Sequence, residues 1–276
     1  MNVSGMIVIP HDKDNLALCA IVTFVMQMSF YLVACTCRID TVTDFAGASN
    51  FVVVAVLTFG LCGVSKYTKC PCICINTASW DNNSFCLLPL QTYSVRQIVL
   101  TLLVILWGVR LASYLLARIL KMGRDDRFNR IRDSPLKFLV FWVFQIMWVY
   151  TVSLPVMFVN SPVAPQVTFG RTDYVGTSLF VIGFVIEFIA DTHKFIFRNN
   201  PSNKGKWMDK GLWKISRHPN YLGEIILWWG AFTISTTILR GARWVAVLGP
   251  VFITILLIFG TGATCLERSS YKKYGK

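Results

Sequence analysis

Residues 176–200 read GTSLFVIGFVIEFIADTHKFIFRNN, and this stretch decides the fold class. A helix that crosses the hydrocarbon core of a bilayer needs about 20 mainly apolar residues, because every backbone amide must find its hydrogen bond inside the segment. The stretch meets that requirement, yet it carries Glu187, Asp191, Lys194 and Arg198. The sequence therefore predicts a membrane-spanning helix with an unusual set of ionisable side chains.

Six further apolar stretches flank this one. Of the 276 residues, 54% are hydrophobic and only 15% are charged, and a soluble domain of this length could not bury so much apolar surface. We therefore expect an all-α, multi-pass transmembrane helical bundle of about seven spans with the lipid bilayer as its partner. The expected spans are residues 16–37, 50–65, 98–120, 136–159, 174–195, 222–239 and 244–261.

The basic residues predict the orientation in the membrane. Seven of the 27 Lys and Arg residues lie between Arg118 and Lys137, and seven more lie between Lys194 and Arg217. Both groups fall in short connections between apolar stretches, where basic residues mark the cytosolic side. The net charge of +13 is therefore explained by topology rather than by nucleic-acid binding. We expect an outer amino terminus and a cytosolic carboxyl terminus.

Three regions follow from this organisation: an outer segment over residues 1–15, a first group of helices over residues 16–160, and a C-terminal region over residues 161–276. A Cys-rich outer loop over residues 67–90 contains Cys70, Cys72, Cys74 and Cys86. Disulfides or free thiols are favoured there over a metal site, because no His or second Cys pair of the required spacing lies nearby. No metal site is predicted elsewhere.

The four ionisable residues of the opening stretch are spaced by four, three and four positions, which places them on one face of a helix. An ionisable group at membrane depth is costly unless it faces protein, water or a ligand. We interpret this charged stripe as the wall of a cavity. A self-contained ion network between helices is the alternative.

A second polar motif precedes the sixth apolar stretch, where residues 216–224 read SRHPNYLGE. Pro219 is suited to the first position of a helix, and Arg217 and His218 would then lie beside free amides at the positive end of a helix dipole, where phosphate binds readily. Asn220, Glu224 and Trp228 follow at four-residue steps on one face. Together with the basic loop before it, this motif suggests an anionic cofactor.

The run GKWMDKGLWKISRHPNYLGE, residues 205–224, resembles the signature of the membrane steroid 5-alpha-reductase-like family, in its DUF1295 branch. The segments TDFA at 43–46, LWGVRL at 106–111 and SLP at 153–155 are also similar to that branch, so the resemblance extends from about Asp40 to Tyr274. It implies an integral membrane protein of the endoplasmic reticulum or a bacterial inner membrane.

The resemblance also implies a reaction: hydride transfer from NADPH to an activated carbon–carbon double bond of a lipophilic substrate held among the first helices. The residues that match the cofactor-binding pattern of the family are Glu187, Asp191, Arg198, Asn203, Arg217, His218, Asn220, Tyr221, Glu224 and Tyr271. Trp107 stands where better-known members have a catalytic tyrosine, so Asp44 and Tyr221 are the candidate catalytic proton donors.

Two other functions remain open from the sequence. Membrane methyltransferases that use S-adenosylmethionine share an Arg-His-Pro-x-Tyr-x-Gly core and a Glu...Tyr...Tyr ending, which Glu267, Tyr271 and Tyr274 would imitate. The many cations of the connecting loop favour the phosphates of NADPH over S-adenosylmethionine, which carries none. The third possibility is a non-catalytic membrane protein that retains the pocket, which Trp107 favours.

Overall fold

A computed structural model describes residues 12–69, 93–122 and 134–260 of the chain, and every regular element in these ranges is a helix. The long helices are α1 (Leu16–Cys37), α2 (Thr43–Lys69), α3 (Val95–Met122), α4 (Pro135–Val159) and α5 (Arg171–Asn199). After them come η3 (Pro201–Asn203), α6 (Leu212–Ile215), α7 (Pro219–Ser235), η4 (Gly241–Val247), α8 (Leu248–Ile255) and η5 (Leu256–Gly260). The predicted all-α class is confirmed.

Six helical segments in the described ranges are long and apolar enough to cross a membrane, namely α1 to α5 and the continuous segment Gly241–Gly260. The seventh predicted span, residues 222–239, corresponds to α7. That helix has 17 residues and, at a rise of 1.5 Å per residue, is about 25 Å long, which is shorter than the hydrocarbon core of about 30 Å. Large apolar side chains such as Leu32 and Leu106 are exposed on the outer surface of the bundle, as expected where lipid is the solvent.

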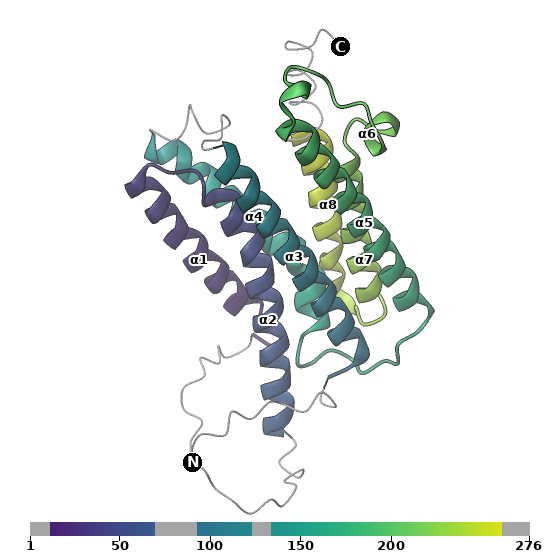
Figure 1. Cartoon of the computed structure of the whole chain (residues 1–276). Coiled ribbons are helices and arrows are strands. Elements are labelled where there is room, and N and C mark those ends of the chain that lie inside the picture. The colour runs from purple at the N-terminus through teal and green to yellow at the C-terminus, as the bar shows by residue number, and fades with distance from the viewer. Residues whose placement is uncertain (1–11, 70–92, 123–133, 261–276) are drawn as a thin grey trace, which may run out of the picture.

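The helices form two groups joined by α3 and α4 (Figure 1). Helices α1, α2 and α4 pack together as the N-terminal group, and α5, α7 and α8 form the C-terminal group. Helix α3 packs along α2 and also contacts α5, while α4 contacts α8. At one end of the bundle α3 and α5 finish and α2 and α7 begin, and the Lys- and Arg-rich connection between α5 and α7 lies there (Figure 1). We call it the basic end.

Four glycines create a close contact between α5 and α7, which is the most extensive helix pairing among the described residues. Gly176 and Gly183 on α5 are seven residues apart, as are Gly223 and Gly230 on α7. A Cβ added at Gly183 would lie 2.5 Å from the carbonyl oxygen of Gly223, and one at Gly230 would lie 2.7 Å from that of Gly176. Small residues that let two backbones approach are the usual basis of tight helix packing in membranes. This glycine seam therefore fixes α7 against α5.

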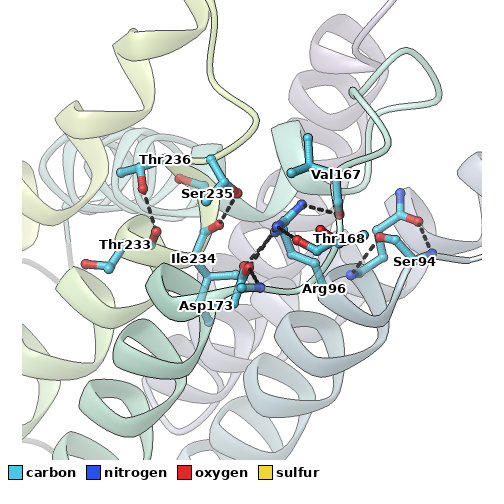
Figure 2. A network of polar contacts seen from close by, with 12 residues as sticks. Ser94, Arg96, Val167, Thr168, Asp173, Thr233, Ile234, Ser235 and Thr236 are labelled. Carbon is cyan, nitrogen blue, oxygen red and sulfur yellow. Dashed lines mark hydrogen bonds and ion pairs between the residues drawn. The ribbon is translucent and has the colours of Figure 1, made fainter.

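A buried arginine ties the other end of α5 to α3. Arg96 at the start of α3 donates from Nε and Nη2 to the Asp173 carboxylate at 2.6 and 2.8 Å, and its remaining bonds go to the carbonyls of Val167 and Thr168 (Figure 2). The Arg96 and Asp173 side chains are 2% and 0% exposed. Asp173 also accepts from the backbone N–H of Gly170 at 2.8 Å, so it caps α5 as well as pairing with α3.

The glycine seam makes a direct prediction about stability. Gly183→Ala should lower the melting temperature of the detergent-purified protein, because the new methyl group would press on Gly223 and on the backbone of Leu227, and such overpacking costs about 1–3 kcal/mol. Gly60→Ala in α2 is the matched control: a Cβ there has no atom within 4 Å, so the usual gain of about 0.5–1 kcal/mol for replacing a helical glycine should appear instead. Similar shifts for the two variants would contradict the seam.

Candidate functional site

The centre of the candidate site is an ion-pair cluster between α3 and α5. The Arg110 guanidinium lies between two carboxylates, pairing with Glu187 through Nη2 and donating from Nη1 to Asp191 at 2.7 Å. Trp107, one turn earlier on α3, donates from Nε1 to Glu187 at 2.9 Å. The side chains of Arg110, Glu187 and Asp191 are 11%, 3% and 7% exposed. Two carboxyl groups therefore share one guanidinium.

This cluster also sets the register of α3 against α5. Arg96 and Arg110 are 14 residues apart on α3, and their partners Asp173 and Glu187 are also 14 residues apart on α5. Both helices rise about 21 Å over that interval, so parallel helices satisfy both pairs at once. The site is therefore held on two helices whose relative position is fixed at two depths.

A pocket of about 310 Å³ opens beside the cluster. Its lining comes from α3 and α5 alone, from residues Arg110, Ser113, Tyr114, Phe188, Asp191 and Thr192. Ser113 and Phe188 are exposed, whereas Asp191 is buried, so the pocket leads from the outer surface of the bundle to the buried charges. A cavity next to the charged stripe was predicted from the sequence. The interhelical ion network that was the alternative is also present, because Arg110 pairs with both carboxylates of the stripe.

Helix α7 brings a third carboxylate to the same place. Gly223 lies so close to α5 that a Cβ there would be 2.6 Å from the backbone nitrogen of Glu187. The next residue, Glu224, is half-buried and lies near Glu187 and Asp191. The glycine seam thus places Glu224 near Glu187 and Asp191, which lie 37 and 33 residues earlier in the chain.

The start of α7 has the predicted geometry. Pro219 occupies the first turn, as expected from its missing N–H, and His218 is the residue before it. The His218 ring stacks on the Tyr221 ring, with centroids 5.2 Å apart and planes 8° apart. Asn220 is half-buried, and its Oδ1 has no hydrogen-bond partner among the described residues. This turn therefore presents an aromatic pair and an available amide oxygen.

The cations of the charged stripe and of the loop after α5 lie at the basic end. Arg198 in the last turn of α5 and Arg217 before α7 are both exposed. Lys194 lies over the Trp213 ring, with Nζ 4.2 Å from the ring centroid. Asn203 donates to the carbonyl of Phe197 at 3.2 Å, so this predicted cofactor residue closes the end of α5.

One predicted residue lies apart from this group, and another lies outside the described residues. Asp44, in the first turn of α2, accepts a hydrogen bond from Arg118 of α3 at 2.7 Å. Tyr271 lies outside the described residues, as do Cys70 to Cys86, so the structure does not test the predictions made for them. Among the residues that are described, no three His, Cys, Asp or Glu side chains gather in a way that could hold a metal ion.

Sequence reasoning missed the partner of the stripe. Arg110 was noted only as part of a family-like segment, although an arginine in the middle of the apolar stretch 98–120 needs a buried acidic partner. The acidic residues of the opening stretch are the natural choice, because they also lie in the middle of an apolar stretch. That complementarity was the available signal.

Comparison with known protein families identifies the family of this chain. A model of the family described as "Protein of unknown function (DUF1295)" matches residues 78–276, which is more than half of the chain. The chain belongs to the DUF1295 family. The predicted resemblance to this branch is thereby confirmed, while the wider link to steroid 5-alpha-reductases stays a prediction.

Two relatives of this DUF1295 protein are informative. It is 25% identical over 252 residues to the uncharacterized protein C594.04c of Schizosaccharomyces pombe, covering 76% of this chain and 71% of the relative. It is 41% identical over 46 residues to the probable O-methyltransferase ustE of Ustilaginoidea virens, covering 17% of this chain and 16% of that protein. No solved structure matches the chain significantly.

The ion-pair cluster predicts a large asymmetry between two arginines of α3. Arg110→Met should destabilise the protein by about 3–5 kcal/mol, because it leaves two buried carboxylates without a cation. Arg118→Met should cost no more than about 1 kcal/mol, because the Arg118 and Asp44 side chains are 29% and 23% exposed. Thermal unfolding in detergent measures both.

A second substitution provides the control for this prediction. Adding Glu187→Gln to Arg110→Met removes one of the two stranded charges and should recover part of the lost stability. Equal losses from Arg110→Met and Arg118→Met, or no recovery in the double variant, would show that the cluster is not the buried anchor described above.

Proposed function

We propose that this protein is an integral-membrane reductase that binds NADPH at its basic end and transfers hydride to an activated carbon–carbon double bond of a lipophilic substrate. The observation that carries the proposal is the buried Arg110, Glu187 and Asp191 cluster, which borders a pocket and lies on the same two helices as the cationic basic end. Buried charges in a membrane helix are by default functional, and a pocket beside them strengthens that inference.

The residues present suit the parts of NADPH. Exposed Arg198 and Arg217, with the exposed Lys204, Lys206 and Lys210 between them, match the negative charge of three phosphate groups. The amino terminus of α7 adds the positive end of a helix dipole. The pocket of about 310 Å³ is at the lower limit for a ligand site, so it suits one end of a dinucleotide while the phosphates lie over the exposed cations.

The chain would contribute position and electrostatic field, because the bound cofactor supplies the hydride. Arg110 and Asp191 offer a donor and an acceptor at the pocket wall. The free Oδ1 of Asn220 is a further acceptor at the start of α7. Of the two candidate proton donors, Tyr221 is the better one, because the Asp44 carboxylate is already engaged as an acceptor for Arg118.

A cluster of large aromatic side chains would keep water away from the reacting centre. The Phe51 ring packs against Trp107, Trp148 and Trp228, with centroids 5.2, 5.1 and 5.4 Å apart. Phe51, Trp107 and Trp228 are at most 1% exposed. This aromatic box borders Glu187 through Trp107, and it suits an apolar substrate that enters from the bilayer.

A methyltransferase that uses S-adenosylmethionine is the second candidate. The 46-residue match to a probable O-methyltransferase favours it. The carboxyl groups of the Arg110 cluster would also suit the sulfonium of S-adenosylmethionine. The exposed cations of the basic end argue for the reductase, because S-adenosylmethionine has no phosphate for them to bind.

Nucleotide binding tests the proposal. NADPH at 100 times its dissociation constant should stabilise the detergent-purified protein by about 2.7 kcal/mol, with little effect of S-adenosylmethionine. Replacing Arg198 and Arg217 together by Gln should weaken NADPH binding at least tenfold, because two charge-assisted contacts to phosphate are lost. Thermal shift against nucleotide concentration measures both effects.

The control substitution is Arg171→Gln, which removes an exposed arginine from the opposite end of α5 and should leave NADPH binding unchanged. Stabilisation by S-adenosylmethionine alone would replace the reductase by the methyltransferase. Stabilisation by neither ligand would indicate a non-catalytic membrane protein.

A further inference from the structure

A second polar centre lies in the N-terminal group of helices, away from the charged cluster. Three amide side chains are buried there between α1, α2 and α4: Gln27, Asn50 and Gln145, which are 0%, 0% and 4% exposed. All three helices are long and apolar enough to cross a membrane. Each amide therefore lies in a helix whose other buried residues are mostly apolar, and together we call them the amide cluster.

The first two turns of α2 provide main-chain carbonyl acceptors for this cluster. Gln27 of α1 donates from Nε2 to the carbonyl of Ala46 at 3.3 Å and to Oδ1 of Asn50 at 3.0 Å. Gln145 of α4 donates to the carbonyl of Thr43 at 2.9 Å. Residues 43, 46 and 50 share one face of α2, so amides from two other helices converge on a single stripe.

Gly47 lies on the same stripe and makes room for α4. A Cβ added at Gly47 would lie 2.5 Å from Nε2 of Gln145 and 2.9 Å from Cζ3 of Trp148. The indole of Trp148 therefore packs over α2 immediately beside the amide cluster. The Trp148 ring also packs against Phe51, the residue that follows Asn50.

Each of the three amide side chains uses one of its two polar atoms and leaves the other without a hydrogen bond among the described residues. Among the described residues, no hydrogen-bond partner exists for Oε1 of Gln27, Oε1 of Gln145, Nδ2 of Asn50 or Nε1 of Trp148. The hydroxyl of Thr23, one turn before Gln27 and 0% exposed, also lacks a partner. Interhelical hydrogen bonds that served only to hold helices together would satisfy both ends of each amide, since a buried unsatisfied group costs about 1–3 kcal/mol.

The unused atoms specify the chemistry of a partner. They comprise two amide oxygens as acceptors, an amide N–H and an indole N–H as donors, and a hydroxyl that serves as either. None of these groups is ionised, so they suit a neutral group better than a phosphate, a carboxylate or an ammonium ion. A hydroxyl or a carbonyl oxygen on an apolar body matches both the donors and the lipid surroundings.

We propose that the amide cluster binds the uncharged polar head, a hydroxyl or a carbonyl, of a lipophilic molecule that enters from the bilayer. The molecule's apolar body then lies toward Phe51, whose ring separates the amide cluster from Trp107 and Trp228. This proposal goes beyond the proposed function, because binding of the head group at the amide cluster does not require the molecule to be the substrate of the reductase. Binding of the molecule at the amide cluster does not depend on NADPH.

Paired probes that differ only in one hydroxyl test the site. The purified protein, without nucleotide, is titrated with 5α-cholestan-3β-ol against 5α-cholestane, and with 1-octadecanol against octadecane, and thermal stabilisation is followed. At least one alcohol should bind about fivefold to a hundredfold more tightly than its hydrocarbon, because it satisfies buried polar atoms that the hydrocarbon leaves unpaired. Equal affinities within both pairs would overturn the proposal, and neither result bears on the NADPH experiment.

Variants locate the effect. Gln145→Leu and Asn50→Leu should each abolish the preference for the alcohol while the hydrocarbon affinity changes little. Thr58→Val is the control, because Thr58 is a buried polar residue of the same α2 helix that bonds instead to Asn160. It should keep the preference. A preference for the alcohol that survives in both Leu variants would show that the hydroxyl binds elsewhere. If a variant does not fold, the comparison of alcohol with hydrocarbon on the wild-type protein still tests the proposal.

Discussion

The position of one guanidinium, that of Arg110 between Glu187 and Asp191, governs how the parts of this membrane protein fit together. A buried cation with two buried anions is stable only where all three are held closely, because each would cost several kcal/mol alone in this environment. Arg96 and Asp173 repeat the constraint about 21 Å away along the same two helices. Helix α3, which packs along α2, is thereby fixed to α5 and through it to the C-terminal group.

The glycine seam extends this constraint to the third helix of the site. Gly183 and Gly223 bring the backbones of α5 and α7 into contact, so Glu224 and the turn that contains His218 and Tyr221 follow from the position of Glu187. The candidate site is thus assembled from three helices with little freedom between them. The amide cluster of the N-terminal group lies beyond the aromatic box, so the protein has a charged centre and an uncharged polar centre with aromatic rings between them.

The sequence predicted the membrane helices well, because hydropathy depends only on local composition. The predicted span 16–37 has the same limits as α1, but α2 begins at Thr43 rather than Asn50, because its first turn is too polar to be recognised by hydropathy. Pro219 correctly marked the start of α7. That helix ends at Ser235 and is too short to count among the six membrane-length segments. The sequence did not reveal this end, because the apolar pattern continues into residues 236–239.

Sequence patterns predicted only part of the site. Spacing along one helix identified Glu187 and Asp191, but their partner Arg110 is about 80 residues away along the chain, and no local pattern encodes that contact. Gln27, Asn50 and Gln145 were passed over because each is a single polar residue in an apolar stretch. Their importance appears only when three helices bring them together, although a buried amide at membrane depth is itself a signal that a partner is required.

Hydrogen–deuterium exchange with and without saturating NADPH tests whether the charged cluster and the basic end form one nucleotide site. We expect slower exchange of the backbone amides in residues 199–218 and at the start of α7, with no change in residues 160–170 at the opposite end of the bundle. Unchanged exchange at the basic end, or protection confined to the opposite end, would contradict this expectation.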